Sequence, residues 1–175
     1  MVRIFVITYG HDDPRKCSAL KMIKLGYATK VSDIRFLPKN CLILNPYSNN
    51  ILTPLDAEII NNYGVAVVDV SWKNGLEVLK KLSYSKRPQR VLPLLFAGNP
   101  INYAVATRLS SMEAVAAALY ITGFKDHSLR ILSTFKWGQT FYNLNKDLLN
   151  LYSQCTSVDE VIKIQNQILR KFNDG

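Results

Sequence analysis

The stretch Gly64-Val65-Ala66-Val67-Val68-Asp69-Val70-Ser71-Trp72 decides the fold. Its apolar run lacks alternating polar residues, which is typical of a strand that is covered on both faces of a parallel sheet. The run ends on Asp69, and Ser71 and Trp72 follow at the strand's carboxyl end, where open parallel sheets bind ligands. Position alone leaves two interpretations open. These residues form a ligand site, or Asp69 or Ser71 caps the next helix while Trp72 belongs to the core.

Other runs of the same kind extend the pattern on both sides of this strand. Further strands are predicted at 2–9, 41–46 and 91–97, with a short one at 34–37. Helices are predicted at 18–25, 53–62, 73–82, 110–122, 124–135, 140–152 and 157–172, several of them opened by capping residues such as Thr53, Ser110 and Ser157. The fold class is therefore α/β, with a parallel-sheet domain at 1–95 and a helical domain at 96–175.

Charge points to a polyanionic partner. The 175 residues carry a net charge of +9. Residues 1–91 hold 14 Lys and Arg against 7 Asp and Glu, whereas residues 92–175 hold 8 against 6. A surface this basic attracts RNA or DNA, so the front half is expected to face nucleic acid. The basic turn Tyr84–Arg90 fits a phosphate backbone or a plain solvated connection equally well.

Several classes of protein are excluded. Three scattered cysteines build no disulfide framework and indicate reduced thiols in the cytoplasm. No signal peptide and no membrane span are expected. His11, Asp13 and Cys17 match no zinc spacing, so no metal is expected. Glycine-rich nucleotide-binding motifs and the Gly-x-Ser-x-Gly motif of hydrolases do not occur in the sequence.

Ordered short motifs cover nearly the whole chain. They are His11-x-Asp13-Pro14-x-Lys16-Cys17-Ser18, Leu44-x-Pro46, Val67-Val68-Asp69-x-Ser71-Trp72, Arg90-x-Leu92-Pro93, Ala97-x-Asn99-Pro100-x-Asn102-Tyr103, Leu109-Ser110-x-x-Glu113-Ala114 and Phe135-x-Trp137-Gly138-x-x-Phe141. In this combination the chain resembles the small-subunit rRNA aminocarboxypropyltransferases of ribosome maturation, in a short archaeal form without an acidic tail.

The resemblance implies a fold and a reaction. The fold would be that of knotted RNA methyltransferases, with a deep trefoil knot. The reaction would move the 3-amino-3-carboxypropyl group of S-adenosylmethionine to N3 of a uridine or N1-methylpseudouridine in small-subunit rRNA, within a pre-ribosomal particle, and release 5′-methylthioadenosine. A monomer is expected. The rivals are an S-adenosylmethionine-dependent RNA methyltransferase and a non-catalytic RNA-binding assembly factor.

The same resemblance assigns residues to the binding of S-adenosylmethionine. Ser18 and Ser111 would hold the methionine carboxylate, and Val68 would bind the ribose through its carbonyl. Leu92 and Thr107 would meet the adenine edge with backbone groups. The apolar surroundings of the adenine or the methyl group would come from Leu44, Pro46, Trp72 and Gly75. The chain departs from the family pattern in having Ser18-Ala19 for Thr-Gly, Gly98 for Ala, Ala104 for Gly and Thr107 for an aromatic residue.

The catalytic and RNA-binding roles are hypotheses of the same kind. Asp69 would act as the base that removes the N3 proton, or it would orient the substrate or cap a helix. Trp72 would cover the methyl group and turn the aminocarboxypropyl carbon toward the RNA. The cations expected to contact RNA are Arg15, Lys16, Lys21, Lys24, Lys73, Arg87 and Arg90.

Overall fold

One parallel sheet organises the amino-terminal half. The computed structural model describes residues 1–9, 17–70, 75–99, 102–104 and 106–174. Within these residues five strands pair in the order β2-β1-β4-β3-β5, and every neighbouring pair is parallel. The strands are β1 Ile4–Thr8, β2 Thr29–Val31, β3 Leu42–Leu44, β4 Val65–Asp69 and β5 Gln89–Arg90. The predicted parallel α/β class is confirmed.

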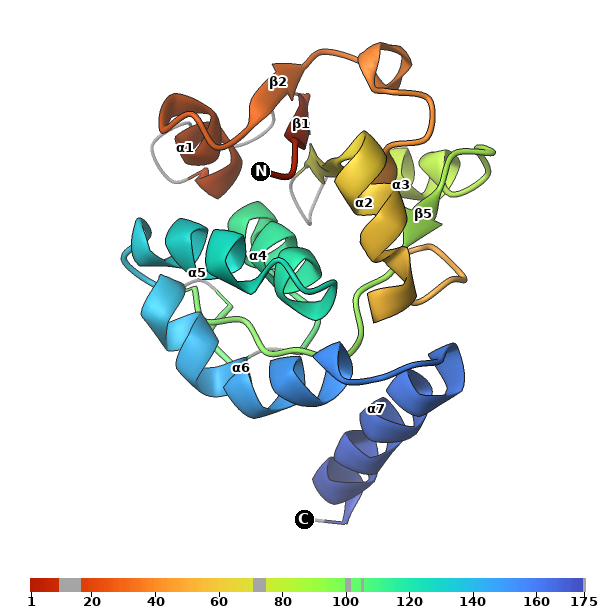
Figure 1. Ribbon diagram of the computed structural model, residues 1–175, viewed down its shortest axis with the longest axis vertical. Helices are drawn as coiled ribbons and strands as arrows, with labels where there is room; N and C mark the ends of the chain where they lie inside the picture. The colour runs from red at the N-terminus through yellow and green to blue at the C-terminus, as the bar shows by residue number, and fades with distance from the viewer. Residues whose placement is uncertain (10–16, 71–74, 100–101, 105, 175) are drawn as a thin grey trace.

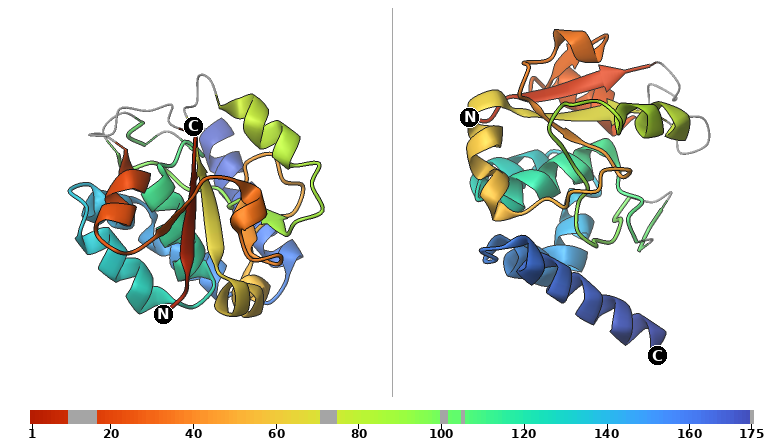
Figure 2. Two further views of the ribbon diagram at one scale, coloured as in Figure 1. Left: turned by 90° about the horizontal axis from the view of Figure 1, so that it is seen from above. Right: turned by 90° about the vertical axis from the view of Figure 1, so that its right-hand side faces the viewer.

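Helices cover both faces of this sheet and then continue away from it. They are α1 Ser18–Lys24, α2 Ala57–Tyr63, α3 Leu76–Leu82, α4 Ser111–Ile121, α5 Lys125–Ser133, α6 Gly138–Ser153 and α7 Val158–Asn173, with short 3-10 turns at η1 Ile34–Phe36 and η2 Pro54–Asp56. In Figure 1, α4 and α5 lie below the sheet, α6 lies below them, and α7 is farthest from the strands. Figure 2 gives the same layers from the side.

The central strand β4 is buried along its whole length, as its sequence predicts. Val65 and Val67 pack into a large cluster with α4, whereas Ala66 and Val68 pack on the other face with Leu79 of α3. Gly64 leads into the strand with a φ of 86°, and a Cβ there would lie 2.7 Å from the carbonyl oxygen of Arg3. Only glycine combines that backbone angle with that approach.

Both halves of the chain contribute to one apolar cluster. It joins β1, β3 and β4 with α1 and with the buried residues of α4, α5 and α6, such as Val115, Ile131 and Phe141. The boundary at residue 95 therefore crosses a shared core. The division into domains 1–95 and 96–175 stays a prediction.

Two predicted strands are wrong. Ile34–Leu37 contains the 3-10 turn η1, because the Asp33 carboxylate accepts the Arg35 N–H and caps it. The predicted strand 91–97 is largely irregular, and only Gln89 and Arg90 before it form β5. Val91 forms a β-bridge with Ile51. After Val91, side chains from other elements form hydrogen bonds with several backbone groups of the segment. Asn145 bonds Phe96 on both sides, while Gln165 accepts from the Leu94 N–H and the Tyr152 hydroxyl donates to the Leu94 carbonyl.

Candidate active site

The carboxyl ends of β1 and β4 form a topological switch point. The two strands are neighbours, and their last residues, Thr8 and Asp69, pair in register. After β1 the chain enters α1, which packs against α4 on one face of the sheet, whereas after β4 it enters α3 on the opposite face. A crevice opens where neighbouring connections leave in opposite directions, and in α/β sheets that crevice binds ligands.

Asp69 lies at this edge of the sheet and has a sulfhydryl as a hydrogen-bond partner. Its side chain is 8% exposed, and its Oδ2 accepts a hydrogen bond from Sγ of Cys17 at 3.2 Å. Burial, reinforced by the Asp69 carboxylate, raises the pKa of the Cys17 thiol to about 11, so the thiol stays protonated as a donor at neutral pH. Cys17 is a functional candidate that the sequence reasoning missed. Its position just before the helix that follows β1 was the available signal.

Ser18 connects the starts of two helices. It is the first residue of α1, and its Oγ accepts the backbone N–H of Met112 in the first turn of α4 at 3.2 Å. Ser18 does not cap its own helix, since Cys17 occupies the N-cap position and makes no side-chain cap. Ser18 and Ser111 therefore lie next to each other, with the Ser18 hydroxyl proton available to a ligand. Such a helix start favours a carboxylate.

Glu113 fixes the loop beside this helix start. Its fully buried carboxylate accepts hydrogen bonds from Gly98 N at 2.6 Å, from Asn99 Nδ2 at 2.7 Å and from Ser110 N at 2.9 Å. The Ser110 hydroxyl accepts the Glu113 N–H in return, which confirms the capping box that the sequence predicts. The loop between the sheet and α4 is thereby tied to the first turn of α4.

Most of the other described residues that are predicted to bind the cofactor stand at, or shortly after, the carboxyl ends of strands. Leu44 and Val68 stand at the ends of neighbouring strands, and Pro46 follows β3. Leu92 follows β5, and Gly75 precedes α3. Thr107 has a φ of 65° and donates its N–H to the Leu95 carbonyl. A β-branched residue rarely adopts that angle, and such strain concentrates at functional sites.

Some predicted residues lie outside the described residues: Trp72, Arg15, Lys16 and Lys73. Their chain positions follow β1 and β4. The roles assigned to them stay predictions.

Three of the other cations expected to bind RNA, Lys21, Arg87 and Arg90, have local partners in the fold. Arg87 donates to the carbonyls of Leu37 and Pro38, on the amino-terminal side of β3. Arg90 forms an ion pair with Asp56 at 3.0 Å. Lys21 and Lys24 are exposed on α1, and the ammonium group of Lys21 lies 4.8 Å from the ring centre of Phe135.

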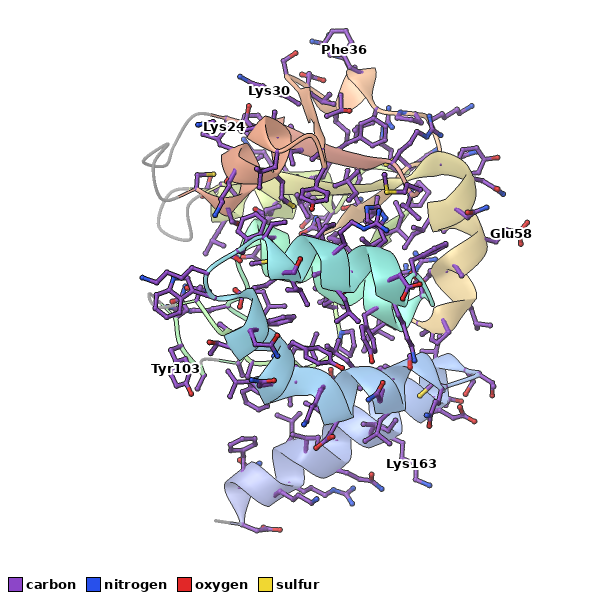
Figure 3. The ribbon with its side chains drawn as sticks, turned by 60° about the vertical axis from the view of Figure 1, so that its left-hand side comes forward. Lys24, Lys30, Phe36, Glu58, Tyr103 and Lys163 are labelled. Carbon is purple, nitrogen blue, oxygen red and sulfur yellow. The ribbon has the colours of Figure 1, made fainter. Side chains whose placement is uncertain are left out.

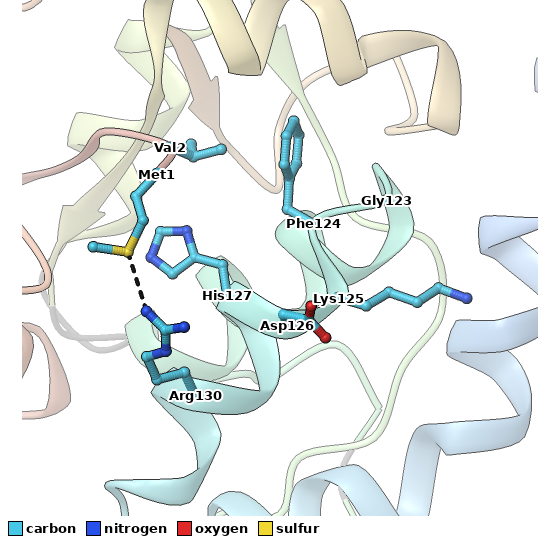
Figure 4. Close-up of a pocket in the computed structure, with 8 residues that line it drawn as sticks. All are labelled: Met1, Val2, Gly123, Phe124, Lys125, Asp126, His127 and Arg130. Carbon is cyan, nitrogen blue, oxygen red and sulfur yellow. Dashed lines mark hydrogen bonds between the residues drawn. The ribbon is translucent and has the colours of Figure 1, made fainter.

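A separate pocket lies at the other end of the sheet. Met1, Val2, Gly123, Phe124, Lys125, Asp126, His127 and Arg130 line it (Figure 4). Met1 and Val2 precede β1, and Gly123 follows α4. The pocket therefore lies at the amino-terminal end of β1 and the carboxyl-terminal end of α4, whereas Asp69 lies at the opposite edge of the sheet. Burial, together with nearby positive charge, lowers the pKa of His127, which keeps the imidazole neutral at pH 7. The pocket is not part of the candidate site.

Two absences hold for the part of the chain that the structure describes. No group of three or more His, Cys, Asp and Glu residues in it could hold a metal ion. None of its helices has both the length and the apolar character that a membrane crossing requires.

Known proteins resemble this chain over nearly its full length. The profile of the ribosome biogenesis protein, C-terminal family matches residues 42–169. A second profile, a possible Fer4-like domain in RNase L inhibitor, matches residues 2–33. Those residues contain Cys17 as their single cysteine, whereas iron–sulfur clusters are held by several thiolates.

The similar curated proteins share one name. The 16S rRNA aminocarboxypropyltransferase of Methanocaldococcus jannaschii is 43% identical, over 98% of this chain and 98% of its own. That of Sulfurisphaera tokodaii is 39% identical, over 97% of each chain. The solved structure of the SAM-dependent rRNA:acp-transferase from Vulcanisaeta distributa matches with a TM-score of 0.83 and 38% identity, over 99% of both chains.

Proposed function

Since the chain belongs to the family of 16S rRNA aminocarboxypropyltransferases, we propose that it modifies N3 of a uridine or N1-methylpseudouridine in small-subunit rRNA. It is a transferase that uses S-adenosylmethionine as donor of the aminocarboxypropyl group and acts in ribosome biogenesis. The observation that carries the proposal is the full-length relationship to these enzymes. The buried carboxylate at the sheet's switch point supports it.

The donor would bind across the switch point. Its carboxylate would meet the Ser18 hydroxyl and the N–H groups at the start of α4, including that of Ser111. This arrangement is supported by the 3.2 Å contact that already joins Ser18 to α4. The ribose would bind the carbonyl of Val68. Leu92 and Thr107 would meet the adenine edge with backbone groups, and Leu44, Pro46, Trp72 and Gly75 would enclose the adenine or the methyl group.

The transfer needs a base and a defined orientation. Asp69 would take the N3 proton, and N3 would then attack the carbon of the aminocarboxypropyl group that is bonded to sulfur. The bond from that carbon to sulfur would break, its electron pair would stay on sulfur, and 5′-methylthioadenosine would leave as a neutral thioether. The Cys17 thiol would hold Oδ2 of Asp69 in place. Trp72 would cover the competing methyl carbon.

The small product tests this reaction directly. Purified protein, S-adenosylmethionine and small-subunit rRNA from a strain lacking the gene should yield 5′-methylthioadenosine in chromatography. S-adenosylhomocysteine would instead indicate a methyltransferase, and the absence of either product would indicate a non-catalytic binding protein. Asp69→Asn should retain donor affinity in calorimetry and lose single-turnover transfer. A full rate in that variant would overturn the role of Asp69 as base.

The working environment is also part of the proposal. We infer that the substrate is rRNA inside a pre-ribosomal particle in the cytoplasm, and that the protein acts as a monomer. The net charge of +9 supports an RNA partner. Sedimentation of the tagged protein with small-subunit precursors, and light scattering of the purified chain, test these two statements.

The knotted-methyltransferase type of fold, with a deep trefoil knot, is proposed on the same family relationship. The parallel sheet and the return of α4 against β4 are compatible with it. Pulling the two termini apart in an optical trap gives the test. A knotted chain reaches a shorter contour than the about 3.3–3.6 Å per residue of a fully extended one. Full extension would exclude the knot.

A further inference from the structure

Trp137 is a large aromatic residue at the surface near the candidate site. It precedes α6 and is 39% exposed, although tryptophan is strongly buried on average. The Nζ atom of Lys136 lies 5.2 Å from the centre of its ring, and Lys21 covers the adjacent Phe135. The surface formed by Lys21, Phe135, Lys136 and Trp137 is called the aromatic platform below.

Two glycines hold the platform rigidly. A Cβ on Gly138, the residue after Trp137, would overlap the backbone carbonyl of Leu132, so the turn between α5 and α6 is packed tightly. A Cβ on Gly98 would lie 2.5 Å from the backbone nitrogen of Phe141, which itself bonds the Trp137 carbonyl. The indole therefore stands on a fixed backbone and does not belong to a free loop.

The same contacts place the platform beside the start of α4. Gly98 donates to Glu113 in the first turn of α4, and Phe141 packs on Gly98. Trp137 lies four residues before Phe141, which is about one helical turn, or about 6 Å, along α6. From the other side, Lys21 reaches Phe135 from α1, whose first residue Ser18 bonds α4.

The neighbouring loop has a similar character. Tyr103 is 57% exposed and points away from the body in Figure 3. Arg108 is exposed in the same loop, which Gly98 and Asn99 anchor to Glu113. Exposed aromatic rings among cations are typical of proteins that bind single-stranded RNA, because bases stack on the rings while the cations contact phosphates.

We propose that the aromatic platform binds the rRNA substrate, with an unpaired base next to the modified nucleotide stacked on Trp137. The inference rests on the proposed function and adds a path for the RNA. The RNA strand reaches the site over the helical half of the protein. It also contacts the basic front half, which is the surface that charge alone indicates. When the modified base leaves its RNA helix to reach Asp69, the bases next to it become unpaired and exposed.

A pair of matched substitutions tests the platform. Trp137→Ala should weaken binding of small-subunit rRNA from a strain lacking the gene by about 5- to 150-fold, the range that loss of one base–aromatic stack gives. Trp137→Phe keeps a ring and should stay much closer to the wild type. Tyr63→Ala is the control, since Tyr63 is 38% exposed at the end of α2, just before the amino-terminal end of β4. Binding is measured by filter retention, and donor affinity by calorimetry.

A fluorescence readout covers the case in which Trp137→Ala does not fold. The chain contains two tryptophans, Trp72 and Trp137, so the RNA-dependent quenching lost between wild type and Trp137→Phe reports on Trp137 alone. Wild-type RNA affinity in Trp137→Ala, or unchanged quenching in Trp137→Phe, overturns the platform while methylthioadenosine release continues. If wild-type protein releases no methylthioadenosine, the proposed function fails instead, whatever Trp137 does.

Discussion

Replacing Cys17 by alanine should slow the transfer without abolishing it. The variant removes the thiol that donates to Oδ2 of Asp69 at 3.2 Å, in surroundings where both side chains are at least nine-tenths buried. Because a thiol is a weak donor, the free energy of unfolding should fall by about 0.5–1.5 kcal/mol, the range of an ordinary hydrogen bond. The variant removes one of the contacts that orient the carboxylate toward the substrate.

The effect on rate follows from what a base contributes. A positioned general base accelerates transfer by about 10²–10⁴-fold, and losing its orientation forfeits only part of that factor. We therefore expect Cys17→Ala to lower the single-turnover rate by about 10- to 100-fold, with donor affinity nearly unchanged. Cys17→Ser keeps a donor and should recover most of the rate.

The assay follows transfer of the donor's labelled carboxyl carbon to rRNA under saturating donor. Urea unfolding of each variant separates a catalytic loss from a loss of folded protein. The reasoning is refuted if Cys17→Ala transfers at the wild-type rate. It is also refuted if Cys17→Ser is as slow as Cys17→Ala, because the donor would then not be the relevant property.

Three further outcomes are expected. Stability should be greatest below about pH 9 and fall above it, because burial raises the thiol pKa of Cys17 to about 11 and that of Cys41 to about 12. The unfolded chain therefore loses these protons first as the pH rises. Urea unfolding under reducing conditions should show the free energy of unfolding falling by about 1.4 kcal/mol per pH unit for each thiol. Glu113→Gln should lower the melting temperature and weaken donor binding, since an amide offers one acceptor atom to a site with three N–H donors; equal melting would contradict this. Ser18→Ala should weaken donor binding about tenfold in calorimetry and Ser18→Thr should restore it, and an unaffected alanine variant would exclude the hydroxyl contact.

Local signals predicted much of the fold. The apolar run of β4 marks a strand buried on both faces, and the structure confirms it. The capping box at Ser110 and the cap at Ser157 mark the starts of α4 and α7 because the residues involved are only three positions apart. Both the strand and the caps depend on neighbours in the chain, which is why a single sequence suffices.

Signals failed where partners lie far apart in the chain. The segment after β5 reads as a strand, yet Asn145 and Tyr152 from α6 take over its backbone bonds, 49 and 58 residues away from their partners. The Cys17–Asp69 bond spans 52 residues and the Ser18–Met112 bond spans 94. The sheet-edge rule could indicate the neighbourhood of these contacts, but not the atoms that meet.

The net charge of this protein predicts the sign of its partner's charge more reliably than it predicts which surface the partner contacts. Arg87 and Arg90 contribute to the positive front half, but their guanidinium groups bind backbone carbonyls and Asp56. Such groups still attract RNA at long range, whereas a stacking ring acts only on contact. The two contributions separate in a salt titration. Trp137→Ala should lower rRNA affinity by a similar factor at every ionic strength, because no phosphate contact is lost. Lys136→Ala should instead reduce the slope of log affinity against log salt, and a reduced slope in Trp137→Ala would contradict the assignment of stacking to that ring.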